Sequence, residues 1–303
     1  MPRPITLFEN LRAVPYTPFY LAIARGDWAA EGIDVSVKTS PAMSQTAEAL
    51  LDGRADVSWG GPMRVMMHHD ADPKCPLICF GQVVAGDPFI LIGRTRKRHF
   101  QFTDLIGQRL AVAIEAPTPW LTFQDDVARA GIDPSSLRRM KDRPMAQNVA
   151  AFRRGRLDVI QVFEPYAEAL IRSGHGHIWH RFATRGDIAY TSFYTTRTFA
   201  RRNRKTCEAL VRGIAKAQVA LHSETPAAIA AAIGEFFPDI APDGLARMIK
   251  GYRDSGLWAR TPALPVEAFT RLKAALVSGE LIGSDPPYAR LVDARLSNAY
   301  EQS

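Results

Sequence analysis

The sequence predicts an α/β fold of two lobes followed by a helical C-terminal segment, and three observations predict it. The chain has 303 residues, enough for two domains that each bury a core. Short apolar runs alternate with helical patterns over the first part of the chain. A motif of a helix, a glycine and a strand occurs twice, which indicates that the lobes share one plan.

Seven short apolar runs are the predicted strands. Runs that alternate with helices are typical of parallel sheets covered by helices, doubly wound in each lobe. The predicted strands are residues 5–8, 33–37, 57–59, 77–84, 89–92, 110–114 and 159–163. From about residue 197 the pattern changes to amphipathic helices, at residues 207–221 and 226–236, so we expect the last third to be helical.

The internal repeat carries the two-lobe interpretation. Residues 49–57 and 151–159 both read Ala-x-x-x-Gly-Arg-x-Asp-Val, and Gly-Ile-Asp occurs at 32–34 and at 131–133. Each copy has a glycine suited to the end of a helix before a strand. Gly-Arg-x-Asp-Val is also ordinary helix-to-strand chemistry, but two matches at nearly equal offsets favour a duplication.

Charge and composition exclude several classes of protein. The net charge is +7, and basic clusters lie at residues 94–98, 153–156 and 201–205. No helix-turn-helix, zinc-finger or RNA-stacking signature accompanies them, so we expect solvated surfaces and no nucleic-acid partner. No apolar run approaches the roughly 18 to 20 residues of a membrane-spanning helix.

The three cysteines, Cys75, Cys79 and Cys207, do not make a disulfide framework. The first residues lack the apolar stretch and the small-residue cleavage site of a secretory leader. We therefore expect a periplasmic protein if a leader has been removed and a cytoplasmic one otherwise.

The carboxyl ends of the predicted strands are the expected ligand site, because helix N-termini point their free N–H groups there. The offsets place residues 16–19 opposite 115–118, and residues 60–63 opposite 162–165. If the lobes face each other, a small ligand fits in a cleft between them. The candidate ligand-binding residues are Asn10, Arg12, Tyr16, Phe19, Trp59, Gly60, Gly61, Arg64, Glu115, Thr118, Phe163, Glu164, Tyr166 and Tyr194.

These candidates also have structural interpretations. The glycine pair 60–61 lets backbone approach a ligand, or makes a tight turn. The aromatic rings hold a planar ligand, or belong to the core. Arg12 and Arg64 suit a carboxylate or sulfonate, whereas Glu115 and Glu164 suit a cationic or hydrogen-bond-donating ligand, or cap helices. The sequence leaves the charge of the ligand open.

Other motifs do not match known chemistry. The segment 68–72 carries His68, His69, Asp70 and Asp72 ahead of two cysteines, and residues 175–180 carry three histidines. Neither has an established zinc spacing, so we expect no metal. HExxH, GxSxG, Walker and GxGxxG motifs are missing, so we expect no cofactor. Binding is therefore the main prediction, and an enzyme using Glu115, Glu164 or His68 as acid or base is the alternative.

The order of several weak motifs resembles the SsuA/THI5-like (NMT1-type) group of type II solute-binding proteins over about residues 4–200. These motifs are Pro-Tyr-x-Pro-Phe-Tyr-Leu-Ala at 15–22, Gly-Ile-Asp-Val at 32–35, Leu-x-Gly-x-Ala-Asp-Val at 51–57, Asp-Leu-x-Gly-x-x-Leu-Ala-Val at 104–112 and Phe-Glu-Pro-Tyr at 163–166.

The resemblance implies two lobes joined by a two-stranded hinge, with crossings near residues 87–89 and 192–194. The first lobe is then 1–88 plus 194–303 and the second is 89–193. It also implies capture of nitrate, bicarbonate, an alkylsulfonate, an aromatic acid or a thiamine-related pyrimidine, for an ABC permease if the protein is exported. We expect a monomer. The yeast-type pyrimidine synthase of the same fold is the alternative, but its cysteine-rich motif is missing here, and residues 39–73 contain no lysine.

Overall fold

The computed structural model describes residues 4–302 and consists of two compact units. The first unit comprises the chain up to Gly86 and again from Gly186 onward, and the second unit is Asp87–Arg185. The first unit is therefore discontinuous in sequence.

The first unit is built on a mixed five-stranded sheet with the order β2-β1-β3-β9-β4. Strand β1 runs parallel to β2 and β3, whereas β9 runs antiparallel to β3 and β4. Its strands are β1 Ile5–Glu9, β2 Val35–Thr39, β3 Val57–Gly60, β4 Leu77–Val84 and β9 Thr191–Thr196.

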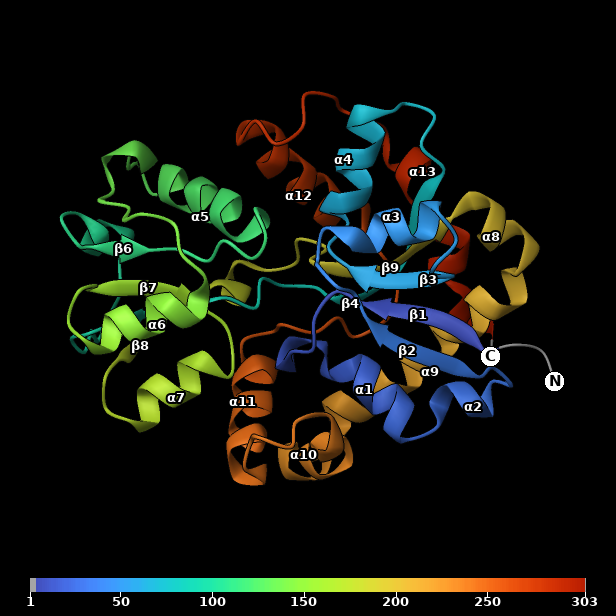
Figure 1. Cartoon of the computed structure of the whole chain (residues 1–303), viewed down its shortest axis with the longest axis horizontal. Helices are drawn as coiled ribbons and strands as arrows, with labels where there is room; N and C mark the ends of the chain where they lie inside the picture. The colour runs from blue at the N-terminus through green and yellow to red at the C-terminus, as the bar shows by residue number, and fades with distance from the viewer. Residues whose placement is uncertain (1–3, 303) are drawn as a thin grey trace. The chain divides into compact units, whose positions relative to one another are not determined.

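Helices cover both faces of this sheet. In Figure 1, α3 and α4 lie on one side of it and α1 and α2 on the other. The α-helices of this unit are α1 Thr17–Ala24, α2 Asp27–Ala30, α3 Gln45–Leu51, α4 Met63–Ala71, α8 Arg197–Arg202, α9 Arg204–Ser223, α10 Pro226–Ile233, α11 Pro242–Asp254, α12 Val266–Ser278, α13 Tyr288–Leu291 and α14 Ala294–Ser297. The short 3-10 turns are η1 Val14–Tyr16, η5 Gly234–Phe236 and η6 Ala299–Gln302.

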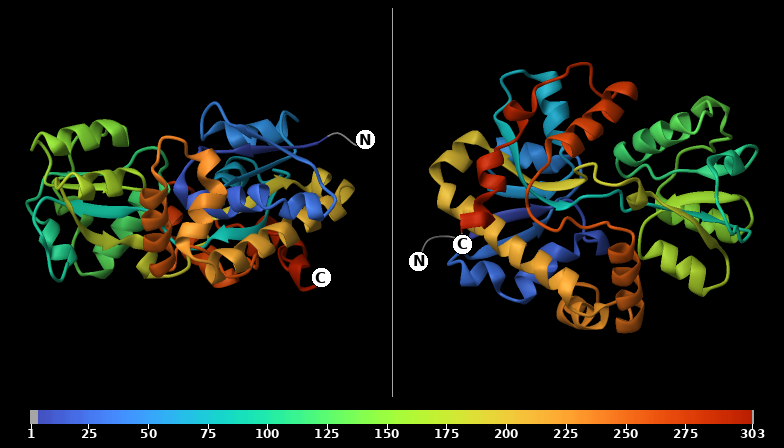
Figure 2. Two further views of the ribbon diagram at one scale, coloured as in Figure 1. Left: turned by 90° about the horizontal axis from the view of Figure 1, so that it is seen from below. Right: turned by 180° about the vertical axis from the view of Figure 1, so that it is seen from behind.

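The long helix α9 packs alongside α1 and α2, as the rear view in Figure 2 shows. A close approach explains the glycine in its middle. A side chain at Gly213 would place a Cβ atom 2.2 Å from the Trp28 ring, and the Trp28 indole donates to the Leu210 carbonyl at 3.0 Å. The helix therefore gives up some intrinsic propensity at Gly213 so that a buried tryptophan can reach its backbone.

The second unit has a four-stranded sheet with the order β6-β7-β5-β8. Strand β7 runs parallel to β6 and antiparallel to β5, which is also antiparallel to β8. Helix α5 lies on one side of this sheet in Figure 1 and α7 on the other. The elements are β5 Ile90–Gly93, β6 Leu110–Ala111, β7 Val159–Val162, β8 His177–Arg181, α5 Thr118–Arg129, α6 Met145–Arg153, α7 Tyr166–Arg172, η2 Phe102–Leu105, η3 Pro134–Ser136 and η4 Phe182–Arg185.

The internal repeat of the sequence corresponds to one repeated structural device. In the first unit the Asp56 carboxylate accepts the backbone N–H of Thr6 at 2.9 Å. In the second unit the equivalent Asp158 accepts the backbone N–H of Arg109 at 2.9 Å. Each aspartate precedes one strand and satisfies a donor at the start of the parallel strand beside it. The predicted common plan is therefore present at the level of side-chain hydrogen bonds.

All seven predicted strands exist, but the prediction of parallel sheets was incomplete. Strands β8 and β9 were not predicted, and β5 and β9 run antiparallel to their neighbours. Residues 191–196 are threonine, serine, phenylalanine and tyrosine, which favour strands, so the sequence did carry a signal for β9.

The predicted second crossing, at residues 192–194, was wrong. Those residues form the middle of β9, which pairs with β3 and β4 inside the first unit. The second unit ends at Arg185 instead of residue 193, and it starts at Asp87 instead of residue 89. Ladder hydrogen bonds on both sides of β9 tie it to the first unit, which is why the boundary falls before it.

Candidate functional site

A cluster of polar side chains lies at the carboxyl ends of β1 and β3 in the first unit. Asn10, which directly follows β1, donates from its amide nitrogen to the Tyr16 hydroxyl at 2.9 Å. Tyr194, on the neighbouring strand β9, donates to the Thr46 hydroxyl at 2.5 Å. Both tyrosines are buried, and burial raises the pKa of each phenol above its usual value. Both hydroxyls therefore stay protonated and available as hydrogen-bonding groups.

Gly60 brings these side chains together. A Cβ atom at Gly60 would lie 3.0 Å from the Tyr194 hydroxyl and 3.6 Å from the Asn10 amide nitrogen. At Gly61 the nearest atom would be the Met63 side chain at 3.4 Å, an ordinary contact. The reason for a glycine at position 60 is therefore the close approach of polar side chains to the backbone. These contacts explain Gly60 by side-chain packing inside the unit, so the approach of a ligand to its backbone stays a prediction.

Arg64 carries the positive charge of this cluster, and the negative charge of Glu48 acts on it without an ion pair. It lies in the first turn of α4 and is half-buried, and its guanidinium has no hydrogen bond or ion pair with any residue of the described range 4–302. Burial raises the pKa of Tyr16 and of Tyr194, and the positive charge of Arg64 opposes this by lowering both. A guanidinium stays protonated at any physiological pH, so this edge of the sheet carries a cation that can bind an anion.

Arg12, the second arginine predicted to bind an anionic ligand, has a different role. Its guanidinium donates to one carboxylate oxygen of Glu9 at 3.0 and 3.3 Å. Glu9 is fully buried and also accepts hydrogen bonds from Tyr20 at 2.8 Å and Thr39 at 2.6 Å. Arg12 therefore neutralises a buried carboxylate that sequence reasoning did not consider. The sequence did carry a signal for this role, since Glu9 is a carboxylate at the end of an apolar strand. A carboxylate buried there needs a cation and hydrogen-bond donors.

Two of the predicted aromatic residues are core residues in this structure. The rings of Phe19 and Trp59 stack at 4.0 Å, and neither side chain has exposed surface. Phe19 also meets the edge of Phe193 at 5.2 Å. The core interpretation therefore holds for both rings. Tyr16, at 9% exposure, is the predicted ring whose polar group joins the cluster of Asn10 and Gly60.

The two predicted carboxylates of the second unit cap helices. Glu115 accepts the backbone N–H of Met145, the first residue of α6, at 2.7 Å. Glu164 is 2% exposed and accepts the backbone N–H of Glu168 in α7 at 2.8 Å. Burial raises the pKa of Glu164 to about 7. Capping, the structural interpretation of these residues, accounts for both contacts.

The remaining candidates of the second unit lie near the same carboxyl ends. Thr118 is the first residue of α5 and is buried, and Phe163 directly follows β7. The Phe163 ring meets the edge of Phe89 at 5.2 Å and lies 6.4 Å from Tyr166, which is half-exposed. None of these contacts tests whether Thr118 or Tyr166 binds a ligand, so that role stays a prediction.

The histidine segments do not form a metal centre within residues 4–302, where no three His, Cys, Asp or Glu side chains are arranged as metal ligands. His69 is buried and its Nε2 lies 2.9 Å from the Leu77 carbonyl oxygen, which ties the end of α4 to β4. His180 packs among aromatic rings, and burial lowers its pKa to about 4.

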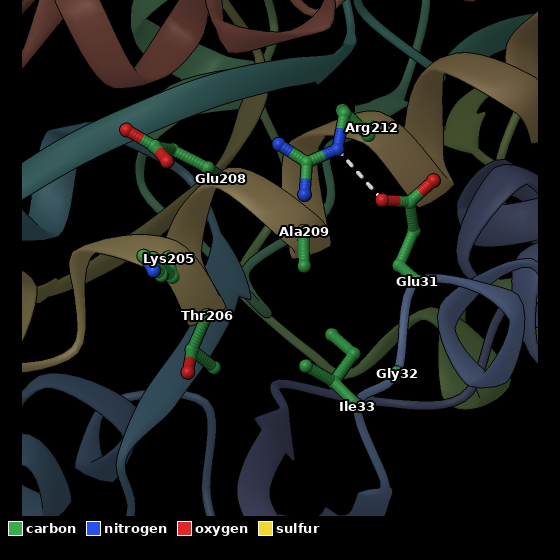
Figure 3. Close-up of a pocket in the computed structure, with 8 residues that line it drawn as sticks. All are labelled: Glu31, Gly32, Ile33, Lys205, Thr206, Glu208, Ala209 and Arg212. Atoms are coloured by element: carbon green, nitrogen blue, oxygen red, sulfur yellow. Dashed lines mark hydrogen bonds and ion pairs between the residues drawn. The ribbon is translucent and has the colours of Figure 1, made fainter. Parts of the chain in front are cut away.

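A hollow of about 500 Å³ lies elsewhere in the first unit, between the turn after α2 and the start of α9 (Figure 3). Three of its four charged lining residues, Glu31, Glu208 and Arg212, already have ion-pair partners. Glu31 accepts from Arg212 at 2.6 Å and from Lys216 at 2.5 Å, and Glu208 pairs with Arg204 at 2.9 Å. It also lies before β2 begins, at the opposite end from Asn10 and Gly60. The candidate site is therefore the cluster around Arg64.

Comparison with known proteins gives the family. The chain belongs to the NMT1-like family, whose model matches residues 11–234. It is 25% identical over 300 residues to the protein named "Putative binding protein YtlA" from Bacillus subtilis (strain 168), covering 97% of this chain and 88% of that one.

Solved structures share the fold. The periplasmic aliphatic sulphonate binding protein SsuA from Escherichia coli matches with a TM-score of 0.77 at 16% identity, over 98% of this chain and 99% of that chain. The desulfurization enzyme DSZB matches with a TM-score of 0.69 at 12% identity, over 99% of each chain. The fold of the two units is thus that of type II periplasmic binding proteins, as the sequence predicts. No helix within residues 4–302 is both long enough and apolar enough to span a membrane.

Proposed function

We propose that this protein binds a small organic or anionic solute for an ABC-type importer. The observation that carries the proposal is Arg64, a half-buried guanidinium in the first turn of α4 without a hydrogen-bond or ion-pair partner in residues 4–302. Asn10 adds an amide to the cluster, and Gly60 lets Tyr194 and Asn10 approach the backbone closely. An ABC permease as partner and the periplasm as compartment are part of the same proposal, supported by the sulphonate-binding protein of the same fold.

The chemistry of this cluster suits a sulfonate, nitrate, bicarbonate or aromatic carboxylate. A guanidinium offers paired donors to two oxygens, and a phenol or an amide adds a further hydrogen bond. A neutral aminopyrimidine, the remaining member of the implied class, would use the amide and the phenols but not the charge of Arg64.

A ligand-transforming enzyme is the second candidate function. Glu164 favours it, because a buried carboxylate with a pKa of about 7 is suited to general acid–base chemistry near neutral pH. The enzyme DSZB, which has the same fold, shows that this architecture can support catalysis. The capping bond to Glu168 explains the position of Glu164 without a reaction, so binding remains the main proposal.

A ligand panel with native mass spectrometry tests both candidates. Methanesulfonate, nitrate, bicarbonate, benzoate and an aminopyrimidine are added singly, and the thermal midpoint is measured against concentration. A bound solute raises the midpoint in a saturable way. Arg64→Gln is expected to weaken binding of an anion at least about tenfold, since a hydrogen bond to a charged group contributes roughly 1.5–3 kcal/mol. Arg201→Gln, an exposed arginine on α8, is the matched control.

Two results would count against the proposal. Slow chemical conversion of a panel member by the pure protein would favour the enzyme. Saturable binding with equal affinity in the wild type and Arg64→Gln would remove Arg64 from the site.

A further inference from the structure

Two of the three basic clusters of the sequence lie side by side in the second unit. Arg94, at the end of β5, joins them. Its Nε donates to the Leu157 carbonyl at 2.8 Å, its Nη2 donates to the Phe152 carbonyl, and its guanidinium lies 4.8 Å from the Phe152 ring. Since Phe152 and Leu157 flank the turn 153–156, the loop 94–98 and this turn make one surface, which we call the basic end.

Most charges of the basic end have no acidic partner, although Lys97 pairs with Asp104. Five of its arginines are exposed, and within residues 4–302 none of their side chains has a hydrogen-bond or ion-pair partner: Arg96, Arg98, Arg153, Arg154 and Arg156. Two carboxylates close to these segments already have partners. Asp104 pairs with Lys97 at 2.5 Å, and Asp158 pairs with Arg109 at 2.6 Å. The basic end therefore presents a net positive surface to whatever lies outside it.

This surface includes a hollow and lies at the opposite end of its sheet from the predicted ligand residue Glu164 of the same unit. The hollow has a volume of about 410 Å³ and is lined by Arg96, Lys97, Arg98, Ile171, His177 and Ile178. In the sheet, Gly93 pairs with Val159 and with His177, so the basic end lies where β5 stops and where β7 and β8 begin. Glu164 follows the other end of β7. A ligand of the basic end would therefore not contact the residues that follow β7, Phe163 and Glu164.

The composition of the basic end indicates its ligand. Guanidinium groups match phosphate geometry with paired hydrogen bonds, and here arginine outnumbers lysine. Single-stranded nucleic acid would need exposed aromatic rings for base stacking. The rings of Phe152 and Trp179 are buried instead, with Arg94 over the first and Lys97 over the second, 5.1 Å from its ring. Guanidinia spread over two loops suit an extended array of phosphates better than one free ion.

We propose that the basic end binds the phosphate headgroups of anionic phospholipids and adsorbs the second unit to a negatively charged membrane surface. Electrostatic adsorption of this kind grows with each added basic residue near the surface and weakens as salt rises.

Vesicle co-sedimentation tests this proposal. The full chain is mixed with phosphatidylcholine vesicles, with and without phosphatidylglycerol, at low and at raised salt. We expect binding to the anionic vesicles alone, with loss at raised salt. The triple variant Arg96→Gln/Arg98→Gln/Arg154→Gln should bind at least about tenfold more weakly. The matched control, Arg201→Gln/Arg202→Gln/Lys205→Gln, removes the same charge from the third cluster and should bind like the wild type.

Three outcomes would overturn the proposal. Equal loss in both triple variants would mean that net charge alone drives adsorption. Pyrophosphate binding without vesicles, lost in the first variant but not in the control, would mean a site for a free phosphate compound. Tight binding of a single-stranded oligonucleotide that is lost in the first variant but kept in the control would mean a nucleic-acid surface. Unchanged thermal midpoints show that all variants are folded, and solute binding at Arg64 is measured separately.

Discussion

Asp87 and Arg185, the first and last residues of the second unit, form an ion pair of 3.1 Å in which the side chains are 0% and 6% exposed. Arg185 also pairs with Asp126 of α5, and Thr122 on the same helix donates to Asp87 at 3.2 Å. The points at which the chain enters and leaves this unit are thus fastened to each other and to one helix. Two buried carboxylates depend on one guanidinium for this arrangement.

Arg185→Met is expected to destabilise the second unit strongly. It leaves Asp87 and Asp126 buried without their cation, and breaking a buried pair in this way costs about 3–5 kcal/mol. Urea unfolding measures the loss. The control is Arg129→Met, which removes an exposed partner of Asp125 at the end of the same helix and should cost less than about 1 kcal/mol. Similar losses in the two variants would show that the buried network does not hold the unit.

Gly60→Ala is expected to be more harmful than Gly61→Ala. The new methyl group at position 60 would lie 3.0 Å from the Tyr194 hydroxyl, whereas at position 61 it would make an ordinary contact at 3.4 Å. We expect a loss of about 1–3 kcal/mol for Gly60→Ala, measured by urea unfolding. Adding Tyr194→Phe should recover part of it, because the closest atom is then removed. If Gly60→Ala is neutral, the close approach at this glycine is not needed.

Glu164 is expected to make stability fall as pH rises through neutrality. Its pKa is raised from an ordinary value near 4.5 to about 7, so the folded state holds a proton more tightly than the unfolded state. The stabilisation is complete below about pH 4.5 and is lost as pH rises through 7, on the order of 3 kcal/mol in all. Glu164→Gln should flatten the change in unfolding free energy between pH 5 and 8. Glu115→Gln, a control at the other capping carboxylate, should keep the wild-type slope.

Asp158 is expected to make the folding stability fall as the pH becomes acidic. Hydrogen bonds from Arg109 lower its pKa to about 2, so the stabilisation is present above the unfolded pKa near 4 and is lost as pH falls towards 2. Asp158→Asn should therefore cost on the order of 2 kcal/mol at pH 7 and less at pH 3, measured by denaturant unfolding. Asp142→Asn, at an exposed pair with Arg139, is the control and should have little effect at either pH. A loss that does not depend on pH would contradict this assignment.

Local patterns were sufficient to predict much of the fold. The apolar runs, the repeated Gly-Arg-x-Asp-Val and the order of the family motifs depend on neighbouring residues, so one sequence contains them. Strand direction does not, since it depends on which strand lies alongside. That is why β9 was assigned to a crossing, although its threonine and aromatic content suited a strand.

The candidate site likewise has features that the sequence predicts and one that only the folded structure reveals. The sequence alone pointed to Asn10, Tyr16, Gly60 and Arg64, because carboxyl ends of parallel strands meet at one edge whatever the details of packing. Tyr194 was selected for a predicted crossing and lies instead on the antiparallel strand β9. Only the tertiary structure decided which charge is free. Arg12 and Arg64 are equivalent as residue types, but Glu9 neutralises the first, and within residues 4–302 nothing pairs with the second. Charge compensation depends on side chains that are distant in sequence, and those distances are fixed only when the chain has folded.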